Sequence, residues 1–290
     1  MEPIHAKTST SSAVFADGVL AGQIAVVTGG GSGLGRETAL ELARCGAQVI
    51  VCGRRFEALS ETAAMSRVGS IEPMACDIRE EEQVASFVDG VIARHGHIDL
   101  LVNNAGGQYL TPAENITPKG FRAVVRTNLE GTWLMTHAVA TKAMMPGSNG
   151  RPPGGKIVSI TLSPHNGMAG MAHSSAARAA VENLTRVLSV EWARFGIRLT
   201  AIAARQFATD TFLTKYPEQI VDAAAGMVPV QRLGRPEELA WLVAYLASPG
   251  GDFFSGAVLT LDGARDNWWG CYPPRVFQDG SGNHLSEQRG

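Results

Sequence analysis

Thr28-Gly29-Gly30-Gly31-Ser32-Gly33-Leu34-Gly35 is the stretch that decides the fold of this chain. The run from Ile24 to Val27 before it is apolar without polar alternation, which is typical of a strand buried on both faces. Residues 36–44 after it are good helix formers, and Gly46 stops the helix. A glycine-rich turn between a buried strand and a helix brings backbone N–H groups against a pyrophosphate. The stretch therefore predicts a dinucleotide-binding loop, with a plain tight turn as the alternative.

Strand-like and helical segments alternate along the rest of the chain. Further strands are expected at residues 48–52, 99–102, 156–161, 197–202 and 257–261, and residues 74–76 are expected to end another strand. This alternation predicts one α/β domain with a doubly wound parallel sheet at residues 23–264. Residues 1–22 are expected to be a flexible lead-in, ordered near Phe15 and Leu20, and residues 265–290 an aromatic tail containing Trp269 and Tyr272. The long segment 203–234 follows a strand, as lids and substrate walls often do.

The composition excludes several classes of protein. The chain has 290 residues, 45% of them hydrophobic, which is enough for a sizeable core. Its net charge of -2 gives no electrostatic attraction for nucleic acid or for an anionic membrane. No apolar run is long enough for a membrane span, and no secretory signal precedes the domain. The cysteines Cys45, Cys52, Cys76 and Cys271 lack zinc-site spacing, so we expect no metal and a reducing cytoplasm.

The end of the second strand predicts which nucleotide is bound. An NAD-preferring unit has a carboxylate there, about 20 residues beyond the loop, to bind the ribose 2′-hydroxyl. Here Gly53 occupies that place, and Arg54 and Arg55 follow it. A missing negative charge and an added guanidinium suit a 2′-phosphate, so NADPH is favoured over NADH. The alternative is that both arginines only solvate the start of the next helix.

The next two strands end in residues suited to the adenosine half of a dinucleotide. Asp77 stands at a carboxyl strand end, where it would accept a hydrogen bond from an adenine amine, with Ile78 beside it. Alternatively, Asp77 caps the acidic helix that follows. The fourth strand runs into Asn103-Asn104-Ala105-Gly106-Gly107, where amides and small residues let a ribose approach the backbone. An asparagine-rich turn would look similar.

One amide lies within an apolar helix. Thr117 is the expected N-cap of this helix, with Pro118 at its first position. Asn128 lies further along among apolar neighbours, where a side-chain amide needs partners. It would hold a water or kink the helix for a proton relay, or it would be a satisfied core polar group.

Taken together, these motifs resemble the short-chain dehydrogenase/reductase family over residues 23–264. Thr28 to Gly35, Asp77, Asn103 to Gly106 and Asn128 stand in the family's order and spacing. The resemblance implies a Rossmann-type fold in which the glycine loop holds the pyrophosphate and Asp77 contacts adenine. It also implies that Asn103 to Gly106 support the sheet and the ribose. Homodimers or homotetramers are implied as well, with the Asn128 and Arg178 helices as packing faces.

The family's catalytic Ser-Tyr-Lys set departs from its usual form here. Arg178 stands at the lysine and Ser174 at the tyrosine, and the usual serine falls at Leu162, with Thr161 and Ser163 beside it. A tyrosine whose pKa is lowered by an ammonium group donates a proton to a ketone oxygen. A serine hydroxyl beside a guanidinium is a poor substitute, which argues against simple ketone reduction.

One branch of the family matches these departures better. Residues 103–114 and the run from His173 to Ala179 are similar to trans-2-enoyl-CoA reductases of peroxisomal type, where an arginine also replaces the lysine. The related 2,4-dienoyl-CoA reductases share this layout. The resemblance implies NADPH-dependent reduction of a conjugated C=C bond in a small molecule, with an acyl thioester as the expected substrate. His173, Thr161 and Ser174 are the candidate donors to the carbonyl oxygen, with Asn128 supporting a water. The chain ends without a Ser-Lys-Leu signal, which again favours the cytoplasm.

A further departure keeps a second hypothesis open. The family's usual Pro-Gly after the sixth strand is replaced by Ala204-Arg205. Arg205 would fill the nicotinamide site, bind an acidic substrate, or point to solvent. If it fills that site, the chain is a family member without redox chemistry that binds a nucleotide or metabolite. A carbonyl reductase with relocated catalytic groups is the weaker alternative.

Overall fold

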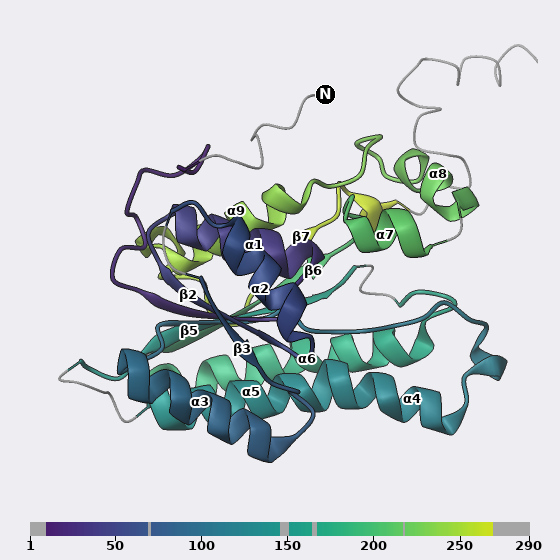
Figure 1. Ribbon diagram of the computed structural model, residues 1–290. Helices are drawn as coiled ribbons and strands as arrows, with labels where there is room; N and C mark the ends of the chain where they lie inside the picture. The colour runs from purple at the N-terminus through teal and green to yellow at the C-terminus, as the bar shows by residue number, and fades with distance from the viewer. Residues whose placement is uncertain (1–9, 69–70, 146–150, 164–166, 217, 269–290) are drawn as a thin grey trace, which may run out of the picture.

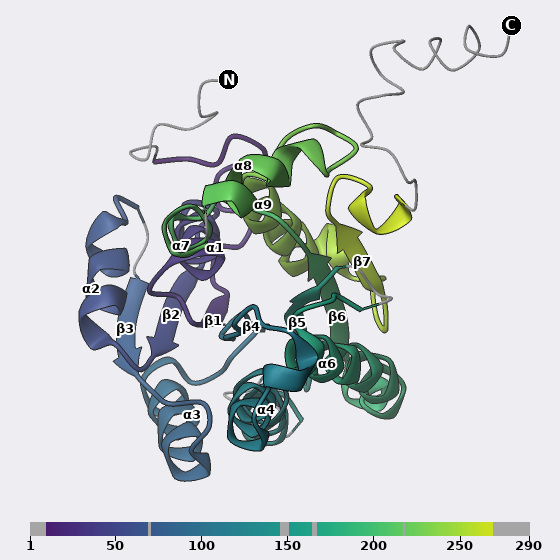
Figure 2. The ribbon, with the colours of Figure 1, turned by 90° about the vertical axis from the view of Figure 1, so that its right-hand side faces the viewer.

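The computed structural model describes residues 10–68, 71–145, 151–163, 167–216 and 218–268. Its centre is a sheet of seven parallel strands in the order β3-β2-β1-β4-β5-β6-β7, which fan from β3 to β7 in Figure 2. The strands are β1 (Ile24–Thr28), β2 (Gln48–Gly53), β3 (Ile71–Ala75), β4 (Leu100–Asn103), β5 (Gly155–Leu162), β6 (Ile197–Ala204) and β7 (Val258–Leu261). This architecture confirms the predicted doubly wound sheet.

Helices cover both faces of the sheet. One face carries α1 (Gly33–Arg44), α2 (Phe56–Met65) and α9 (Pro236–Ala247), which lie above the sheet in Figure 1. The other face carries α3 (Glu81–His95), α4 (Pro118–Val125), α5 (Gly131–Val139) and α6 (Ala172–Glu191). Short 3₁₀ turns occur at Ala113–Asn115, Ala193–Phe195, Pro249–Gly251 and Arg265–Asn267.

The central strands are apolar on both sides because each side faces a separate core. Val49 and Val51 pack with α1 and α9 residues such as Leu42. Ile50, between them on β2, packs with α3 and α5 residues such as Met135 on the opposite face. Successive side chains of a strand alternate between faces, so burial of both faces needs an uninterrupted apolar run. This is the pattern that the sequence shows before the glycine loop.

The predicted elements differ from the observed ones mainly at their ends. The first helix begins at Gly33, inside the glycine loop, rather than at Arg36. The third strand begins at Ile71 and ends before Cys76. Helix α6 ends at Glu191, because a 3₁₀ turn and then Gly196, with φ of 70°, redirect the chain into β6.

The helix that carries Asn128 is interrupted as well as capped. Thr117 caps it by accepting a hydrogen bond from the Gly120 N–H at 3.0 Å, as predicted. Between α4 and α5 the chain forms one π-helical turn, Arg126–Glu130, and a second π turn follows α5 at Ala140–Met144. Such turns often occur at functional sites, because the wider turn re-aims a side chain. Asn128 lies in the first of them.

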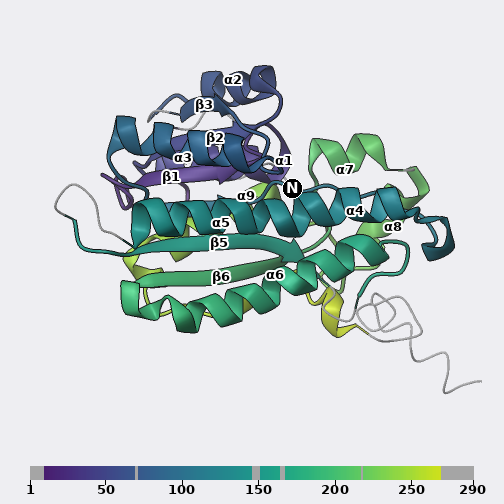
Figure 3. The same ribbon diagram turned by 90° about the horizontal axis from the view of Figure 1, so that it is seen from below.

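The lead-in and the segment 203–234 both lie against the domain. Leu20 is buried and its N–H donates to the Cys45 carbonyl at 2.9 Å, while Phe15 packs on the core. The segment 203–234 contains α7 (Asp210–Lys215) and α8 (Glu218–Gly226), which lie beyond the carboxyl end of β5 in Figure 3.

Residues 1–9, Trp269, Cys271 and Tyr272 lie outside the described residues. The domain boundaries remain a prediction. No helix among the described residues is long and apolar enough to cross a membrane.

Candidate active site

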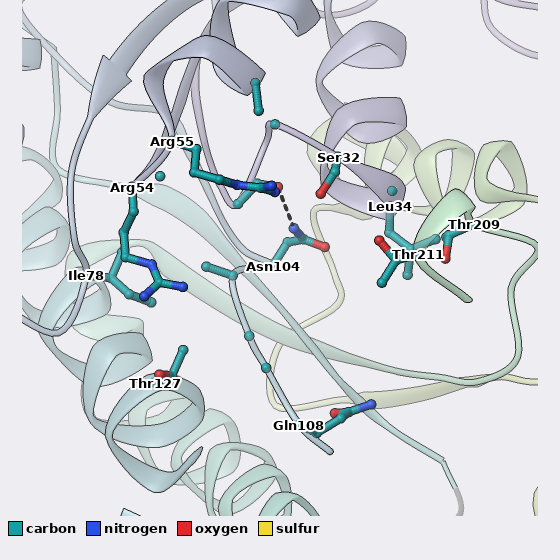
Figure 4. Close-up of a pocket in the computed structure, with 18 of the residues that line it drawn as sticks. Ser32, Leu34, Arg54, Arg55, Ile78, Asn104, Gln108, Thr127, Thr209 and Thr211 are labelled. Atoms are coloured by element: carbon teal, nitrogen blue, oxygen red, sulfur yellow. Dashed lines mark hydrogen bonds between the residues drawn. The ribbon is translucent and has the colours of Figure 1, made fainter. Parts of the chain in front are cut away.

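The carboxyl ends of the strands open into a cavity of about 740 Å³, here called the groove. The groove lies where the strand order reverses between β1 and β4, which is where open α/β sheets bind ligands. Figure 4 shows Arg54 and Ile78 close together at one end and Thr209 and Thr211 at the other. Predicted cofactor residues that line the groove are Gly29, Gly31, Ser32, Gly33, Leu34, Arg54, Arg55, Asp77, Ile78, Asn104, Ala105 and Gly106.

The N-terminus of α1 is prepared for an anion. Ser32 is the N-cap, and its hydroxyl makes no capping hydrogen bond. The first turn of the helix carries no acidic residue. The unpaired N–H groups and the positive end of the helix dipole therefore face the groove without a competing carboxylate. This arrangement fits a pyrophosphate.

Thr28 and Gly35 shape the loop from behind rather than lining the groove. The Thr28 hydroxyl accepts hydrogen bonds from the N–H groups of Asn104 at 3.0 Å and Ala105 at 2.9 Å. A Cβ added at Gly35 would stand 2.5 Å from the Gly29 carbonyl oxygen. The helix therefore packs directly on the loop backbone and leaves no room for a side chain. Thr28 and Gly35 therefore support the loop but do not line the groove.

Arg54 and Arg55 are exposed where they line the groove. Within the described residues, neither guanidinium has an ion-pair partner. A free cation beside a nucleotide groove is available for phosphate, whereas a solvating arginine usually lies against a helix carboxylate.

Asp77 is paired more tightly than the sequence indicates. Arg79 donates from Nε to one carboxylate oxygen at 2.9 Å and from its terminal nitrogen to the other at 2.5 Å. These hydrogen bonds from Arg79 hold the pKa of Asp77 below its usual range. Glu80, not Asp77, is the N-cap of α3. Arg79 also lines the groove, so the site carries a cation that our sequence reasoning missed.

Asn128 ties its π turn to the loop after β4. Its oxygen accepts from the Gly107 N–H at 2.8 Å, and its nitrogen donates to the Gly107 carbonyl at 3.0 Å and to the Ser174 hydroxyl at 3.4 Å. Of the alternatives above, the structure favours a satisfied buried amide that fixes the site.

Of the two residues of α6, Arg178 lines the groove, whereas Ser174 is fully buried and lines neither the groove nor the second cavity described below. Arg178 donates from Nε to Ser174 Oγ at 3.3 Å and from one terminal nitrogen to the Ile160 carbonyl at 2.8 Å. Its other terminal nitrogen lies beside Gly106, where an added Cβ would be 2.8 Å away. Burial lowers the pKa of Arg178 to about 10, so the guanidinium is charged at neutral pH.

Gln108 links this cluster to the cavity walls. Ser174 Oγ donates to Gln108 Oε1 at 3.0 Å, and Gln108 lines the groove. Sequence reasoning passed over Gln108 because it lies in an irregular loop after the asparagine pair. Its position directly after Gly106-Gly107, within a functional loop, was the available signal.

A second cavity of about 370 Å³, here called the inner cavity, adjoins the groove. Arg178, Gln108 and Leu34 line both spaces. The inner cavity has mainly apolar walls, including Leu110, Ile160, Leu162, Met168, Met171, Phe207, Phe212 and Ile220. Thr209 and Thr211, from the predicted substrate segment, also line both spaces. The arrangement suits a polar cofactor in the groove and an apolar reactant beside it.

Thr161 and His173 lie differently from each other. Thr161 lines the inner cavity, but its hydroxyl donates to the buried Glu182 carboxylate at 2.9 Å. His173 is fully buried and absent from the lining of both cavities. Its ring stands edge-on to Tyr109, with centroids 4.5 Å apart. The structure therefore does not bring His173 to the reacting space, and its predicted donor role has no geometric support.

Arg205 is directed neither to bulk solvent nor into the groove. It lines the inner cavity, and one terminal nitrogen donates to the Ser163 carbonyl at 3.3 Å. Burial lowers its pKa, and the neighbouring Arg265 lowers it further. Arg205 is absent from the groove lining.

Comparisons with known proteins agree with this geometry. A family model described as Enoyl-(Acyl carrier protein) reductase matches residues 29–264. The probable 2,4-dienoyl-CoA reductase of Bacillus subtilis is 34% identical over 254 residues, covering 86% of this chain and 97% of that protein. The peroxisomal 2,4-dienoyl-CoA reductase of Arabidopsis thaliana is 33% identical, covering 86% of each chain.

A solved structure agrees over the same region. The citronellol catabolism dehydrogenase of Pseudomonas aeruginosa has a TM-score of 0.78 and 41% identity, covering 89% of this chain and all of that one (100%). The family match includes β2 to β7, the glycine loop from Gly29 onward and the segment 203–234. The chain therefore belongs to the short-chain dehydrogenase/reductase family and is an oxidoreductase of the nicotinamide-dependent kind.

Proposed function

We propose that this enzyme uses NADPH to reduce a C=C bond conjugated to the carbonyl of an acyl thioester. The observation that carries the proposal is the position of Arg178, whose guanidinium stands where the groove meets the inner cavity. A reacting carbonyl beside the nicotinamide would lie at this junction. The printed names of the relatives, which are dienoyl-CoA reductases, support the substrate class.

The choice of NADPH is supported by the cations at the adenosine end. Arg54, Arg55 and Arg79 line the groove, and Arg79 is paired with Asp77. A 2′-phosphate placed there would accept charge-assisted hydrogen bonds from Arg54 or Arg55. A bare 2′-hydroxyl would find no free carboxylate, because Asp77 is already bound by Arg79.

The reaction needs hydrogen-bond donors for an oxyanion. Bound NADPH would supply the hydride to the β-carbon, which pushes the electrons of the C=C bond toward the carbonyl oxygen. We assign Arg178 to stabilise the resulting enolate oxygen, because its charge is partly buried and fixed by Ile160 and Ser174. Asn128 and Gln108 hold the Ser174 hydroxyl in place. The α-carbon takes its proton from water, so no tyrosine-like acid is required.

The test compares two substrates that differ only in reaction type. With purified enzyme, we expect NADPH oxidation to be much faster with a trans-2-enoyl-CoA than with the 3-ketoacyl-CoA of the same length. Equal rates would favour the carbonyl reductase instead. Absence of oxidation with any conjugated substrate would favour a nucleotide-binding protein without redox chemistry.

Location and assembly complete the proposal. Cys45, Cys52 and Cys76 are buried free thiols, which fits a reducing compartment such as the cytoplasm.

We further propose a homodimer or homotetramer that packs through α4, α5 and α6. Large apolar side chains are exposed on these helices, among them Phe121, Trp133, Val187 and Val190.

A further inference from the structure

The wall of the inner cavity contains two polar residues that have no role in the proposed reaction. Arg205 and Gln206, directly after β6, line the inner cavity but not the groove. Among the residues that the structure describes, Arg205 Nε and Gln206 Oε1 are buried atoms without a hydrogen-bond partner. Buried polar atoms are nearly always paired, and an unpaired one costs free energy that a bound ligand can recover.

The guanidinium of Arg205 also lacks a counter-ion among the described residues. Among the described residues, no carboxylate lies within ion-pair distance of it. The nearby Asp262 is engaged elsewhere, accepting from the Ser163 hydroxyl and from the N–H groups of Arg265 at 3.1 Å and Asp266 at 2.7 Å. No acidic residue occurs among the described residues that line the inner cavity. An apolar chamber with cationic groups and no carboxylate selects for an anion.

The backbone holds these side chains in place. Gln206 has φ of 57°, a left-handed conformation that costs energy for a residue other than glycine. The strain is kept because the Gln206 carbonyl accepts from the Gly234 N–H at 3.0 Å and Phe207 bridges to Gly234. This turn holds both residues at the wall of the inner cavity, and both also line the small cavity next to it.

We propose that Arg205 and Gln206 form a carboxylate subsite in the inner cavity. The substrate would then be an aliphatic compound that carries a carboxylate apart from its reacting C=C–C=O group. Arg205 would donate from Nε to the carboxylate, and the Gln206 amide would donate after rotating its NH₂ toward it. The assignment of this cavity to the substrate rests on the proposed function.

Binding of unreactive probes tests the subsite. Octanoate and octanamide have nearly the same shape, but only octanoate is charged at neutral pH. With NADP⁺-saturated enzyme, calorimetry should give octanoate a Kd at least about tenfold below that of octanamide. Arg205→Met should bring the ratio close to one by weakening octanoate alone. Arg205→Lys should keep part of the preference, since it retains the charge but loses the planar donor.

Arg232→Gln is the matched control. Arg232 lines a small neighbouring cavity of about 190 Å³ that Arg205 also borders, but it does not line the inner cavity. We expect this variant to keep the octanoate preference. If Arg232→Gln abolishes the octanoate preference and Arg205→Met keeps it, the anion binds in the smaller cavity, and the proposal is overturned.

Further outcomes are equally decisive. Equal affinities for the two probes in the unmodified enzyme would overturn the subsite, even if Arg205→Met does not fold. Equal weakening of both probes by Arg205→Met would show a structural role instead. An octanoate preference in an enzyme that oxidises no NADPH with enoyl thioesters would overturn only the proposed reaction. NADPH oxidation without the preference would overturn only the subsite.

Discussion

At the scale of single residues, Arg54 tests the proposed preference for NADPH. Arg54→Ala should weaken NADPH by about 1.5–3 kcal/mol, because a charge-assisted bond to the 2′-phosphate is lost. NADH affinity should change little. Fluorescence titration with both nucleotides measures the difference, and Arg122→Ala, an exposed arginine of α4 that does not line the groove, is the control. Equal affinities for NADPH and NADH before mutation would contradict the assignment.

Arg178 gives a prediction about pH. In the proposed reaction the charged form of Arg178 stabilises the enolate oxygen, and burial lowers the pKa of this guanidinium to about 10. Activity in the chemical step should therefore be constant at neutral pH and fall as pH rises through about 10. In Arg178→Lys the ordinary pKa is about 10.4, and the same burial would lower it, so the fall should begin at lower pH.

Removing the charge of Arg178 tests its role directly. Arg178→Met should lower kcat by on the order of 10²-fold or more, with a smaller change in KM, because the lost contact strengthens only in the transition state. Steady-state rates across pH for the three proteins provide the measurement. An unchanged pH profile in Arg178→Lys would remove Arg178 from the oxyanion site.

The residue scale also shows what sequence reasoning can reach. Ser32, Gly33 and Leu34 were predictable, because a strand, a glycine loop and a helix in that order fix local backbone geometry. The burial of His173 was not predictable, because it depends on Tyr109, which is distant in sequence. The pairing of Asp77 by Arg79 was also missed, although the two are adjacent, because rotamers decide it.

At the scale of elements, α1 lies directly on the glycine loop. Gly35→Ala should destabilise the fold by about 1–3 kcal/mol, because the added methyl meets the Gly29 backbone. Cofactor affinity should fall as well, since the loop must move. Thermal unfolding and NADPH titration measure the two effects.

Gly226→Ala is the control for that change. An added Cβ at Gly226, the last residue of α8, has nothing within 4 Å, so its effect should be neutral or slightly stabilising. Unaltered NADPH binding in Gly35→Ala would contradict this prediction, because it would show that the loop backbone can move without loss of cofactor affinity.

Elements were predicted better than their interruptions. The succession of strands and helices along the chain was predicted from the alternating apolar runs, whereas the order of the strands within the sheet was not predicted. The π turn at Arg126–Glu130 left no comparable pattern. The Asn128 side chain in this turn forms hydrogen bonds with the backbone of Gly107, a contact between distant parts of the chain that local sequence does not reveal.

At the scale of the whole molecule, the exposed valines of α6 allow a test of the proposed assembly. Val190 is 78% exposed although it is apolar. If α6 packs against a second copy, Val190→Asp should reduce the molar mass in solution to half or a quarter, because a buried unpaired charge is costly. Light scattering after size exclusion gives the mass.

Phe253→Ser serves as the comparison. Phe253 is fully exposed in the loop before β7, away from the proposed interface, and its change should leave the mass unaltered. A monomer before mutation would contradict the proposed assembly.

The shared wall between the groove and the inner cavity has a thermodynamic consequence. Arg178, Gln108, Thr209 and Thr211 face both spaces, so a nicotinamide in the groove completes one side of the inner cavity. Cofactor and substrate should then bind cooperatively. Linkage requires reciprocity: if NADP⁺ tightens an unreactive substrate analogue by some factor, the analogue tightens NADP⁺ by that same factor.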